Sequence, residues 1–255
     1  KHVLANKADI GFAFDGDGDR VGVVDNNGHE IFADKIGLLI ARNLATEVSN
    51  SKFVIDVKST SLFTTDEILK KNNSEVIFWK TGHSYIKRKT SDINATAGFE
   101  RSGHFFFNSP VGRGYDDGIL SALEILKILD KNEKQTIANL YNQITKTFSS
   151  PTMSPKCPEE SKYKLIEKLE EIFQYKMKNN ETVAGQKILS ILTVNGVRIH
   201  LEDGSWGLVR ASSNSPNLVV VCESTISEER MKEIFNDINN ELMKFNEIGE
   251  YDQKI

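Results

Sequence analysis

The sequence has few of the features that mark membrane, disulfide-linked or nucleic-acid-binding proteins. No apolar run approaches the ~18 residues that a membrane-spanning helix needs, so we expect no membrane partner. The only two cysteines, Cys157 and Cys222, form no CxxC pair, which is typical of a protein in the reducing cytoplasm rather than of a disulfide framework. The net charge is −4, and this lack of excess positive charge argues against a nucleic-acid partner.

The start of the chain also lacks expected features. The first residues, KHVLANKADIG, contain no continuous apolar region, which excludes a signal peptide there. There is no initiator Met, and a predicted strand, IGFAF, follows almost at once without an earlier partner. We therefore expect that further sequence precedes Lys1.

The composition is that of a globular protein with a substantial core. The chain has 255 residues, of which 39% are hydrophobic and 27% charged, enough for one large or two ordinary domains. Strand and helix patterns alternate from about residue 30 to 148, which predicts an α/β domain with a mixed, mostly parallel sheet. A proline-rich segment, FSSPTMSPKCPEES, predicts a linker. A helix, several short strands and a second helix then predict a smaller α+β domain with a mainly antiparallel sheet.

One helix is predicted in some detail. The stretch DDGILSALEILKIL begins with Asp116 and Asp117, either of which can cap the helix start. Ile119, Leu123 and Leu126 recur at helical spacing, so we expect them to line one face of the helix.

The stretch FAFDGDGDRVGVVD contains three aspartates, Asp15, Asp17 and Asp19, between two apolar runs. Gly16 and Gly18 alternate with them and permit unusual backbone angles, so the loop can curl its carboxylates around one point. Converging carboxylate oxygens bind hard divalent cations, and such a cation would remove the repulsion between the three charges. The alternative is a solvated hairpin tip, but tips rarely contain three aspartates.

Two other motifs compete with a plain magnesium loop. An EF-hand is excluded because its sixth position is Arg20 and its twelfth is Asn26, where Gly and Glu are required. An aspartyl phosphatase also begins with an apolar strand that leads into DxD, with Asp15 as nucleophile and Asp17 as acid. In either case, Arg20 beside the metal suits a phosphate group.

Three further polar stretches follow predicted strands. WKTGHSYIK surrounds His83, GFERSGH contains Glu100 and Ser102, and Lys58 follows a strand in IDVKSTS. Loops at the carboxyl ends of strands are where α/β sheets bind ligands, although each stretch alone is equally typical of an ordinary polar loop. RASSNSP, between two strands near the end of the chain, offers a guanidinium, hydroxyls and an amide to a phosphate.

In this order and spacing, the motifs resemble those of the α-D-phosphohexomutases, most closely the bacterial phosphomannomutase/phosphoglucomutase branch. DGDGDR resembles the magnesium loop of that family, and GFERSGH resembles its sugar-binding GExSG(H) loop. WGLVRASSNSP resembles its C-terminal phosphate loop, RxSNT or RxSGT, except that Ser213 replaces Asn or Gly and Asn214 replaces Thr. The resemblance covers nearly the whole chain.

The resemblance implies roles for individual residues. It implies Mg²⁺ ligands at Asp15, Asp17 and Asp19, and catalytic groups at Arg20, Lys58 and His83. The substrate-binding residues that it implies are Glu100, Ser102, His104, Arg210, Ser212, Ser213, Asn214 and Ser215.

The family's phosphoserine loop, similar to Thr-Ala-Ser-His-Asn-Pro, is missing from this sequence. The resemblance therefore implies a C-terminal portion: residues 1–29 end a second domain, 30–148 form a third and 149–255 a fourth. It also implies transfer of a phosphoryl group between O1 and O6 of a mannose or glucose phosphate, with the N-terminal domains of the same polypeptide as partner. Two alternatives remain open, an aspartyl phosphatase and a non-enzymatic carbohydrate-binding module whose ligand binding resists EDTA.

Overall fold

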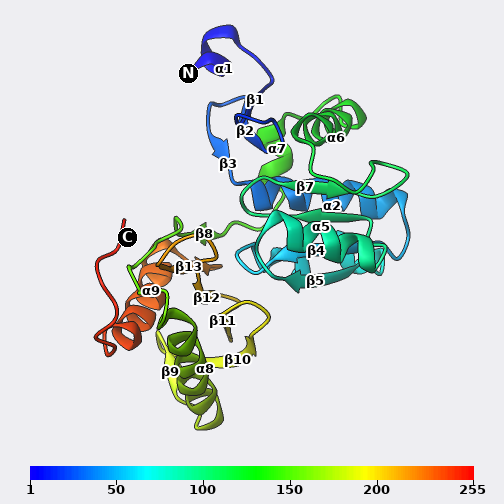
Figure 1. Cartoon of the computed structure of the whole chain (residues 1–255). Coiled ribbons are helices and arrows are strands. Elements are labelled where there is room, and N and C mark those ends of the chain that lie inside the picture. The colour runs from blue at the N-terminus through cyan, green and yellow to red at the C-terminus, as the bar shows by residue number, and fades with distance from the viewer. The chain divides into compact units, whose positions relative to one another are not determined.

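A computed structural model describes all residues, 1–255, and divides the chain into two compact units. The first unit comprises Lys1–Thr145 and the second Lys146–Ile255. Figure 1 labels their helices and strands. No helix combines the length and the apolar character needed to cross a bilayer.

A small antiparallel sheet opens the first unit. After the short helix α1 (His2–Asn6), strands β1 (Ile10–Phe14), β2 (Val21–Asp25) and β3 (Glu30–Ile31) pair in the order β1-β2-β3. Phe14 pairs with Val21, so the acidic segment between them closes a hairpin. Alternation places Val21 and Val23 in the core and leaves the loop at the end of the hairpin.

The second sheet of this unit is mixed, in the order β5-β4-β6-β7. Strand β4 is parallel to β5 and β6, whereas β7 is antiparallel to β6. The bounds of the strands are β4 Lys52–Asp56, β5 Glu75–Trp79, β6 Ala97–Phe99 and β7 Phe105–Phe107. Strands that are buried on both faces are typically continuous apolar runs, which explains FVI in β4 and FFF in the antiparallel strand β7.

Helices cover both faces of the mixed sheet. Phe53 and Ile55 point into the core shared with α2 (Ala33–Glu47) and α6 (Gly118–Lys131), while Val54 between them packs with α5 (His83–Asp92). Shorter helices complete the unit: α3 Leu62–Thr65, α4 Glu67–Lys71 and α7 Ile137–Asn142. The predicted α/β class is confirmed.

The face of helix α6 that Ile119, Leu123 and Leu126 line is not the face that meets the core. These side chains are 65%, 55% and 41% exposed. Ala122 and Ile125 lie on the buried face instead. The helix has apolar residues on both sides, and helical spacing alone does not decide which side meets the core.

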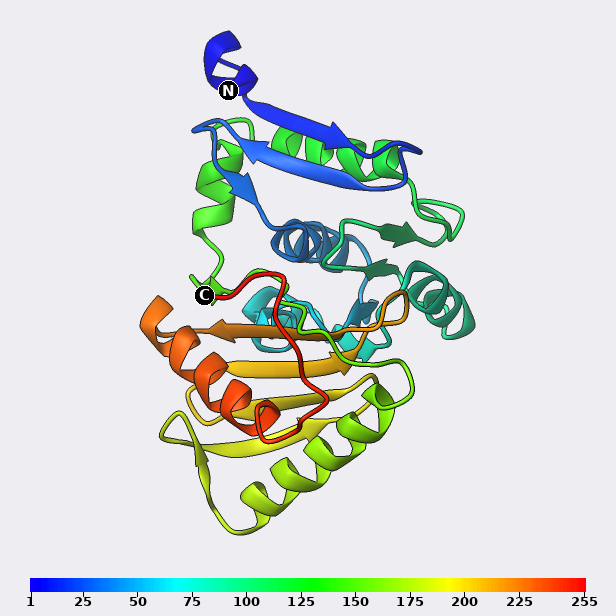
Figure 2. The ribbon, with the colours of Figure 1, turned by 60° about the vertical axis from the view of Figure 1, so that its left-hand side comes forward.

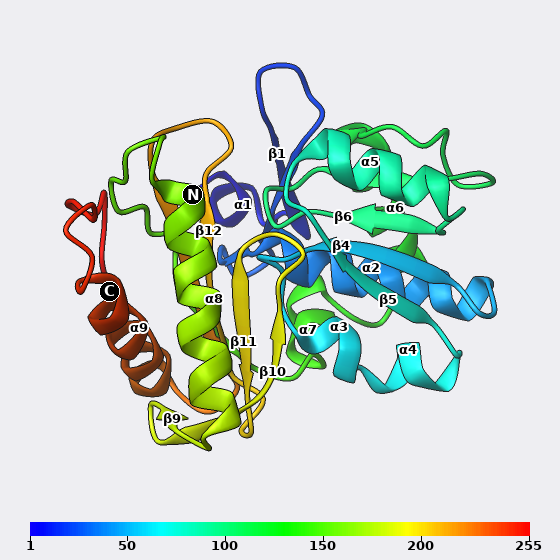
Figure 3. The same ribbon diagram turned by 60° about the horizontal axis from the view of Figure 1, so that its bottom comes forward.

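The second unit is a sheet with two helices on the same face (Figures 2 and 3). Its strands are all antiparallel, in the order β8-β13-β12-β11-β10-β9. The bounds are β8 Phe148–Ser149, α8 Lys162–Lys178, β9 Thr182–Val183, β10 Gln186–Leu192, β11 Val197–Leu201, β12 Trp206–Ala211, β13 Leu218–Ser224 and α9 Glu228–Leu242. Leu169 of α8 and Ile234 of α9 are among the fully buried residues of this core. The α+β prediction is confirmed.

The proline-rich segment lies along this second unit. Met153 pairs with Val220, and Pro155 forms a bridge with Tyr251 near the end of the chain. The segment is therefore anchored by backbone hydrogen bonds at several points.

Asp203 stabilises the second unit through a largely buried ion pair. Its carboxylate accepts hydrogen bonds from Arg230 Nε and the Ser205 N–H, both at 2.9 Å. Burial raises the pKa of Asp203, but these hydrogen bonds lower it more, so the folded-state pKa lies below the ordinary value of 3.8. The ion pair therefore contributes its full stability above that value and loses it as the pH falls through the folded-state pKa.

We predict that Asp203→Asn lowers the free energy of unfolding by about 1–3 kcal/mol at neutral pH. Below pH 3.8 the difference from the wild type should shrink as the wild-type carboxylate becomes protonated. Urea unfolding, followed by the fluorescence of buried Trp206 in a Trp79→Phe background, measures both quantities. Glu202→Gln, at the exposed neighbouring position, is the control, and an equal loss of stability there would contradict the account.

Candidate functional site

The acidic loop brings three carboxylates to one place. It joins β1 to β2, and Gly18 has a φ of +76°, a conformation that side chains disfavour. Asp15, Asp17 and Asp19 each place one carboxylate oxygen so that all three lie within 4.8 Å of one another. We call residues 15–20 the metal loop.

Arg20 neutralises part of this charge. Its Nε lies 2.5 Å from Asp15 Oδ2 and 3.9 Å from Asp19 Oδ1. Burial raises the pKa of Asp15, but the hydrogen bonds and charge of Arg20 lower it more, so the carboxyl stays ionised. One guanidinium cannot balance three carboxylates, and the loop keeps an excess of negative charge.

The donor set of the loop fits a hard divalent cation. Asp19 Oδ1 is buried and has no hydrogen-bond donor. Burial raises the pKa of Asp19, and the charges of Asp17 and Asp15 raise it further, although His104 opposes them. A cation among the three oxygens would relieve this repulsion, and an all-oxygen set suits Mg²⁺.

The segment Glu100–His104, here called the sugar loop, connects β6 to β7. Glu100 is only 2% exposed; it accepts the Gly82 N–H at 2.5 Å and the Ser102 hydroxyl at 3.2 Å. Its Oε2 lies 3.1 Å from His104 Nδ1. Burial raises the pKa of Glu100, but the hydrogen bonds from His104 and the Gly82 N–H lower that pKa more. Burial lowers the pKa of His104, but the neighbouring Glu100 raises that pKa more. The two groups hold each other in their charged forms.

His104 joins the sugar loop to the metal loop. Its Nε2 lies 3.5 Å from Asp19 Oδ1, and His104 and Arg20 form an antiparallel bridge. The Val21 N–H donates to the Gly103 carbonyl at 3.3 Å. A Cβ at Gly103 would lie 2.9 Å from the Val21 carbonyl, and its φ is +97°, so glycine is required there. The structure thus brings together two motifs that are about 80 residues apart in the sequence.

Lys58 lies at the carboxyl end of β4 beside a carboxylate that the sequence analysis missed. Asp56 is fully buried and accepts from Ser59 Oγ at 2.6 Å and Thr81 Oγ1 at 3.2 Å. Lys58 Nζ is 3.7 Å from Asp56 Oδ2, and its charge also lowers the pKa of Glu100. Asp56 thus connects the Lys58 loop to the loop that contains Thr81.

His83 and Asp116 complete the group in the first unit. The His83 ring stacks on that of His104 with centroids 5.7 Å apart, and its Nδ1 lies 3.6 Å from Asp116 Oδ2. Asp117, not Asp116, caps α6, because its carboxylate accepts the Leu120 N–H at 2.9 Å. The Asp116 carboxylate is therefore free of the helix cap and faces His83. The DDG motif alone could not indicate which of the two aspartates caps the helix.

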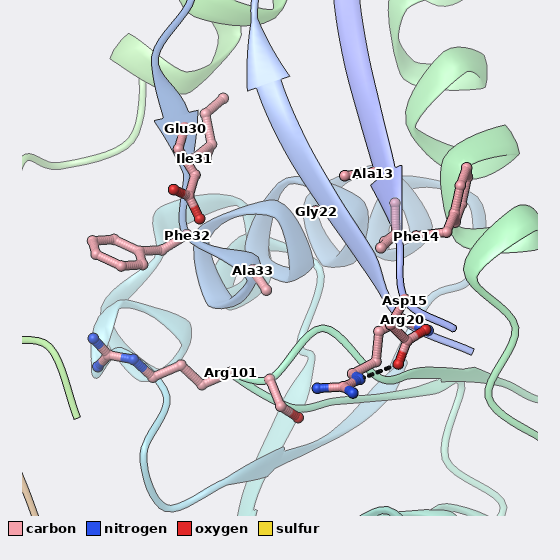
Figure 4. Close-up of a pocket in the computed structure, with 12 residues that line it drawn as sticks. Ala13, Phe14, Asp15, Arg20, Gly22, Glu30, Ile31, Phe32, Ala33 and Arg101 are labelled. Atoms are coloured by element: carbon pink, nitrogen blue, oxygen red, sulfur yellow. Dashed lines mark hydrogen bonds and ion pairs between the residues drawn. The ribbon is translucent and has the colours of Figure 1, made fainter. Parts of the chain in front are cut away.

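A pocket of about 340 Å³ lies beside the metal loop. Figure 4 shows Asp15 and Arg20 at one end of it and Arg101 at another. The Arg101 guanidinium lies 5.3 Å from the centre of the Phe32 ring and donates to the Lys58 carbonyl. Two guanidinium groups in its wall give the pocket a composition that suits an anion.

The predicted phosphate-binding residues form a separate group in the second unit, at the turn after β12. Arg210 Nη2 donates to Ser213 Oγ at 3.2 Å, and Nε donates to Asn195 Oδ1 at 3.0 Å. The Ser212 and Ser215 hydroxyls lie 2.9 Å apart, and the Asn214 N–H donates to Ser212 Oγ at 3.4 Å. A guanidinium, several hydroxyls and backbone N–H groups thus converge within one turn, here called the phosphate loop.

A buried lysine donates hydrogen bonds to the backbone of the phosphate loop. The Lys162 side chain is fully buried, and its Nζ donates to the carbonyls of Ser212 at 2.6 Å and Ser215 at 3.2 Å. It also pairs with Glu159 at 2.6 Å. Sequence analysis missed Lys162 and Asn195 because both are distant from the loop in sequence and neither belongs to a motif.

The family comparisons agree with the motifs. The family model "Phosphoglucomutase/phosphomannomutase, alpha/beta/alpha domain III" matches residues 32–148, and that of the C-terminal domain of the same family matches residues 156–241. The chain is 36% identical over 237 residues to a phosphomannomutase/phosphoglucomutase of Pseudomonas aeruginosa, covering 92% of this chain and 48% of that protein. It is 33% identical to a phosphoglucomutase of Neisseria meningitidis, covering 85% of this chain and 44% of that protein.

A solved structure of a phosphoglucomutase/phosphomannomutase family protein from Burkholderia thailandensis is also similar. The TM-score is 0.77 at 30% identity, and the match covers 95% of this chain and 48% of that one. The chain therefore spans about half the length of the relatives it matches.

The aspartyl-phosphatase alternative is not supported, because both family matches and the similar structure belong to the mutases. In addition, the two strands that flank Asp15 belong to a small antiparallel hairpin rather than to a parallel sheet. Because models of two domains of this family match residues 32–148 and 156–241, the chain belongs to the phosphoglucomutase/phosphomannomutase family.

Proposed function

We propose that this chain supplies the metal, sugar and phosphate loops of a mutase that moves a phosphoryl group between O1 and O6 of mannose or glucose. In this proposal, a phosphoserine in the N-terminal domains of the same polypeptide donates the group and takes one back through a bisphosphate intermediate. Residues 1–29 would then end the second domain of the enzyme, and 30–148 and 149–255 would be its third and fourth. The observation that carries the proposal is the contact of His104 with both Glu100 of the sugar loop and Asp19 of the metal loop.

The carboxylates of the metal loop hold the cation that phosphoryl transfer needs. Bound by Asp15, Asp17 and Asp19, Mg²⁺ would neutralise charge on the phosphoserine during transfer. Arg20 faces the same region and orients a phosphoryl oxygen, as suits a guanidinium with a free donor edge. The pocket beside Arg20 and Arg101 offers that oxygen a polar wall.

The sugar loop binds the hexose. Glu100 is ionised and accepts hydrogen bonds, so it binds sugar hydroxyls, with Ser102 as a second contact. His104, His83 and Lys58 lie around it and are the candidates for moving the proton of the attacking hydroxyl. Lys58 follows β4, His83 begins α5, and His104 directly precedes β7.

The phosphate loop binds the phosphate that is not transferred. Arg210 supplies the charge, and the hydroxyls of Ser212, Ser213 and Ser215 with the amide of Asn214 supply hydrogen bonds. Lys162 keeps the loop in shape. A fixed anchor allows either phosphate of a bisphosphate to occupy the loop, so both sugar orientations can use one site.

The test is mutase turnover by a polypeptide that includes the proposed N-terminal domains. We expect it to interconvert the 1- and 6-phosphates of mannose or glucose, and we expect no turnover from the 255-residue chain, which has no phosphoserine loop. Turnover by this chain alone would contradict the phosphoserine account. EDTA should abolish turnover, whereas EDTA-resistant binding without turnover would support a carbohydrate-binding module.

The metal role predicts a specific loss in Asp17→Asn. This substitution should weaken Mg²⁺ binding to the 255-residue chain at least about tenfold, because it removes one of three anionic ligands. In a polypeptide that includes the proposed N-terminal domains, it should remove nearly all turnover. Isothermal titration calorimetry with Asp9→Asn as an exposed control separates this from a general charge effect, and unchanged Mg²⁺ affinity would exclude the metal role.

The phosphate loop predicts a second loss in Arg210→Met. Binding of glucose 6-phosphate to the 255-residue chain should weaken at least about tenfold, because a charge-assisted contact is removed. Arg88→Met, at an exposed position of α5, changes the net charge equally and serves as the control. Equal affinities in the two variants would place the phosphate elsewhere.

A further inference from the structure

A second group of possible metal ligands overlaps the metal loop. Asp19, His104 and Asp116 each offer a ligand atom, and the three atoms lie within 4.8 Å of one another. They come from three segments, the metal loop, the sugar loop and the residue before the cap of α6. Only Asp19 is shared with the group formed by Asp15 and Asp17.

Asp116 is poorly satisfied without a cation. Its side chain is only 10% exposed, and its Oδ2 has no hydrogen-bond donor; His83 Nδ1 lies 3.6 Å away. Asp19 Oδ1 is also buried without a donor. A buried carboxylate oxygen is costly unless a donor, a charge or a metal compensates it, and here two such oxygens face the same space.

His104 is oriented as a metal-binding histidine. Glu100 Oε2 lies 3.1 Å from Nδ1, which places the proton of a neutral ring on Nδ1. When an ion displaces the Nε2 proton of the charged ring, the Nε2 lone pair faces Asp19, whose Oδ1 is 3.5 Å away. A carboxylate that accepts from one imidazole nitrogen while the other binds the ion is the usual arrangement around protein-bound zinc.

The donor set selects the ion. One imidazole nitrogen and two carboxylate oxygens suit Zn²⁺ in tetrahedral coordination, whereas Mg²⁺ prefers oxygen ligands alone. His83 Nδ1 lies 3.6 Å from Asp116 Oδ2 and is a candidate for the fourth ligand. We propose that Asp19, His104 and Asp116 form a second cation site, selective for Zn²⁺.

Because Asp19 belongs to both groups, the two ions compete for it. When Zn²⁺ binds Asp19, that carboxylate is no longer available to Mg²⁺. Zn²⁺ therefore lowers the affinity of the metal loop for Mg²⁺. Inhibition of turnover by Zn²⁺ follows only if the proposed mutase function is correct. Zinc binding itself is measured on this chain without any turnover, so the two proposals can fail separately.

Isothermal titration calorimetry with ZnCl₂ and with MgCl₂ tests the site on the 255-residue chain. Asp116→Asn removes a ligand from the zinc group alone, and Asp17→Asn removes one from the magnesium group alone. We expect Asp116→Asn to weaken Zn²⁺ binding at least about tenfold and to leave Mg²⁺ binding unchanged, and Asp17→Asn to do the reverse. Saturating Zn²⁺ should also weaken Mg²⁺ binding.

His29→Asn is the matched control, because His29 Nδ1 also lies beside a carboxylate, 3.7 Å from Asp25 Oδ2. Unchanged Zn²⁺ affinity in Asp116→Asn, or an equal loss in His29→Asn, would overturn the proposal. Circular dichroism checks that Asp116→Asn is folded. If it is not, the ring ¹⁵N resonances of the wild type decide: Zn²⁺ must shift those of His104, and a shift confined to His29 would overturn the site.

Discussion

The site of the first unit depends on one histidine held between two carboxylates. His104 contacts Glu100 through Nδ1 and Asp19 through Nε2, at 3.1 and 3.5 Å. Without it, a buried glutamate and a cluster of three aspartates would face each other with little to offset their repulsion. The imidazole and the Arg20 guanidinium offset part of this negative charge. The divalent cation of the proposed function would offset the rest.

The fold supplies this arrangement through strand ends. Strand β1 ends at the metal loop, and the segments that follow β4, β5 and β6 contain Lys58, His83 and Glu100. Buried Asp56 connects these loops through hydroxyl contacts, so the groups are positioned by rigid elements rather than by exposed chain. The phosphate loop of the second unit is organised independently, on the buried ammonium of Lys162.

Much of this could be predicted from sequence where a local pattern was sufficient. Three aspartates between glycines predict a metal loop, and the strand–helix order predicts both units. The exposed face of α6 could not be predicted, because Leu123 and Ile125 are equally apolar and only tertiary packing distinguishes them. Asp116 and Lys162 were missed for a similar reason: their partners are distant in sequence, and no short motif records such contacts.

The central claim is that the metal and sugar loops form one site through His104. Hydrogen–deuterium exchange of the 255-residue chain, measured with and without Mg²⁺, tests it directly. The account predicts that Mg²⁺ slows exchange in residues 15–20 and also in residues 100–104, because ordering of Asp19 is transmitted to His104. Protection confined to residues 15–20, with exchange in the sugar loop unchanged, would contradict it.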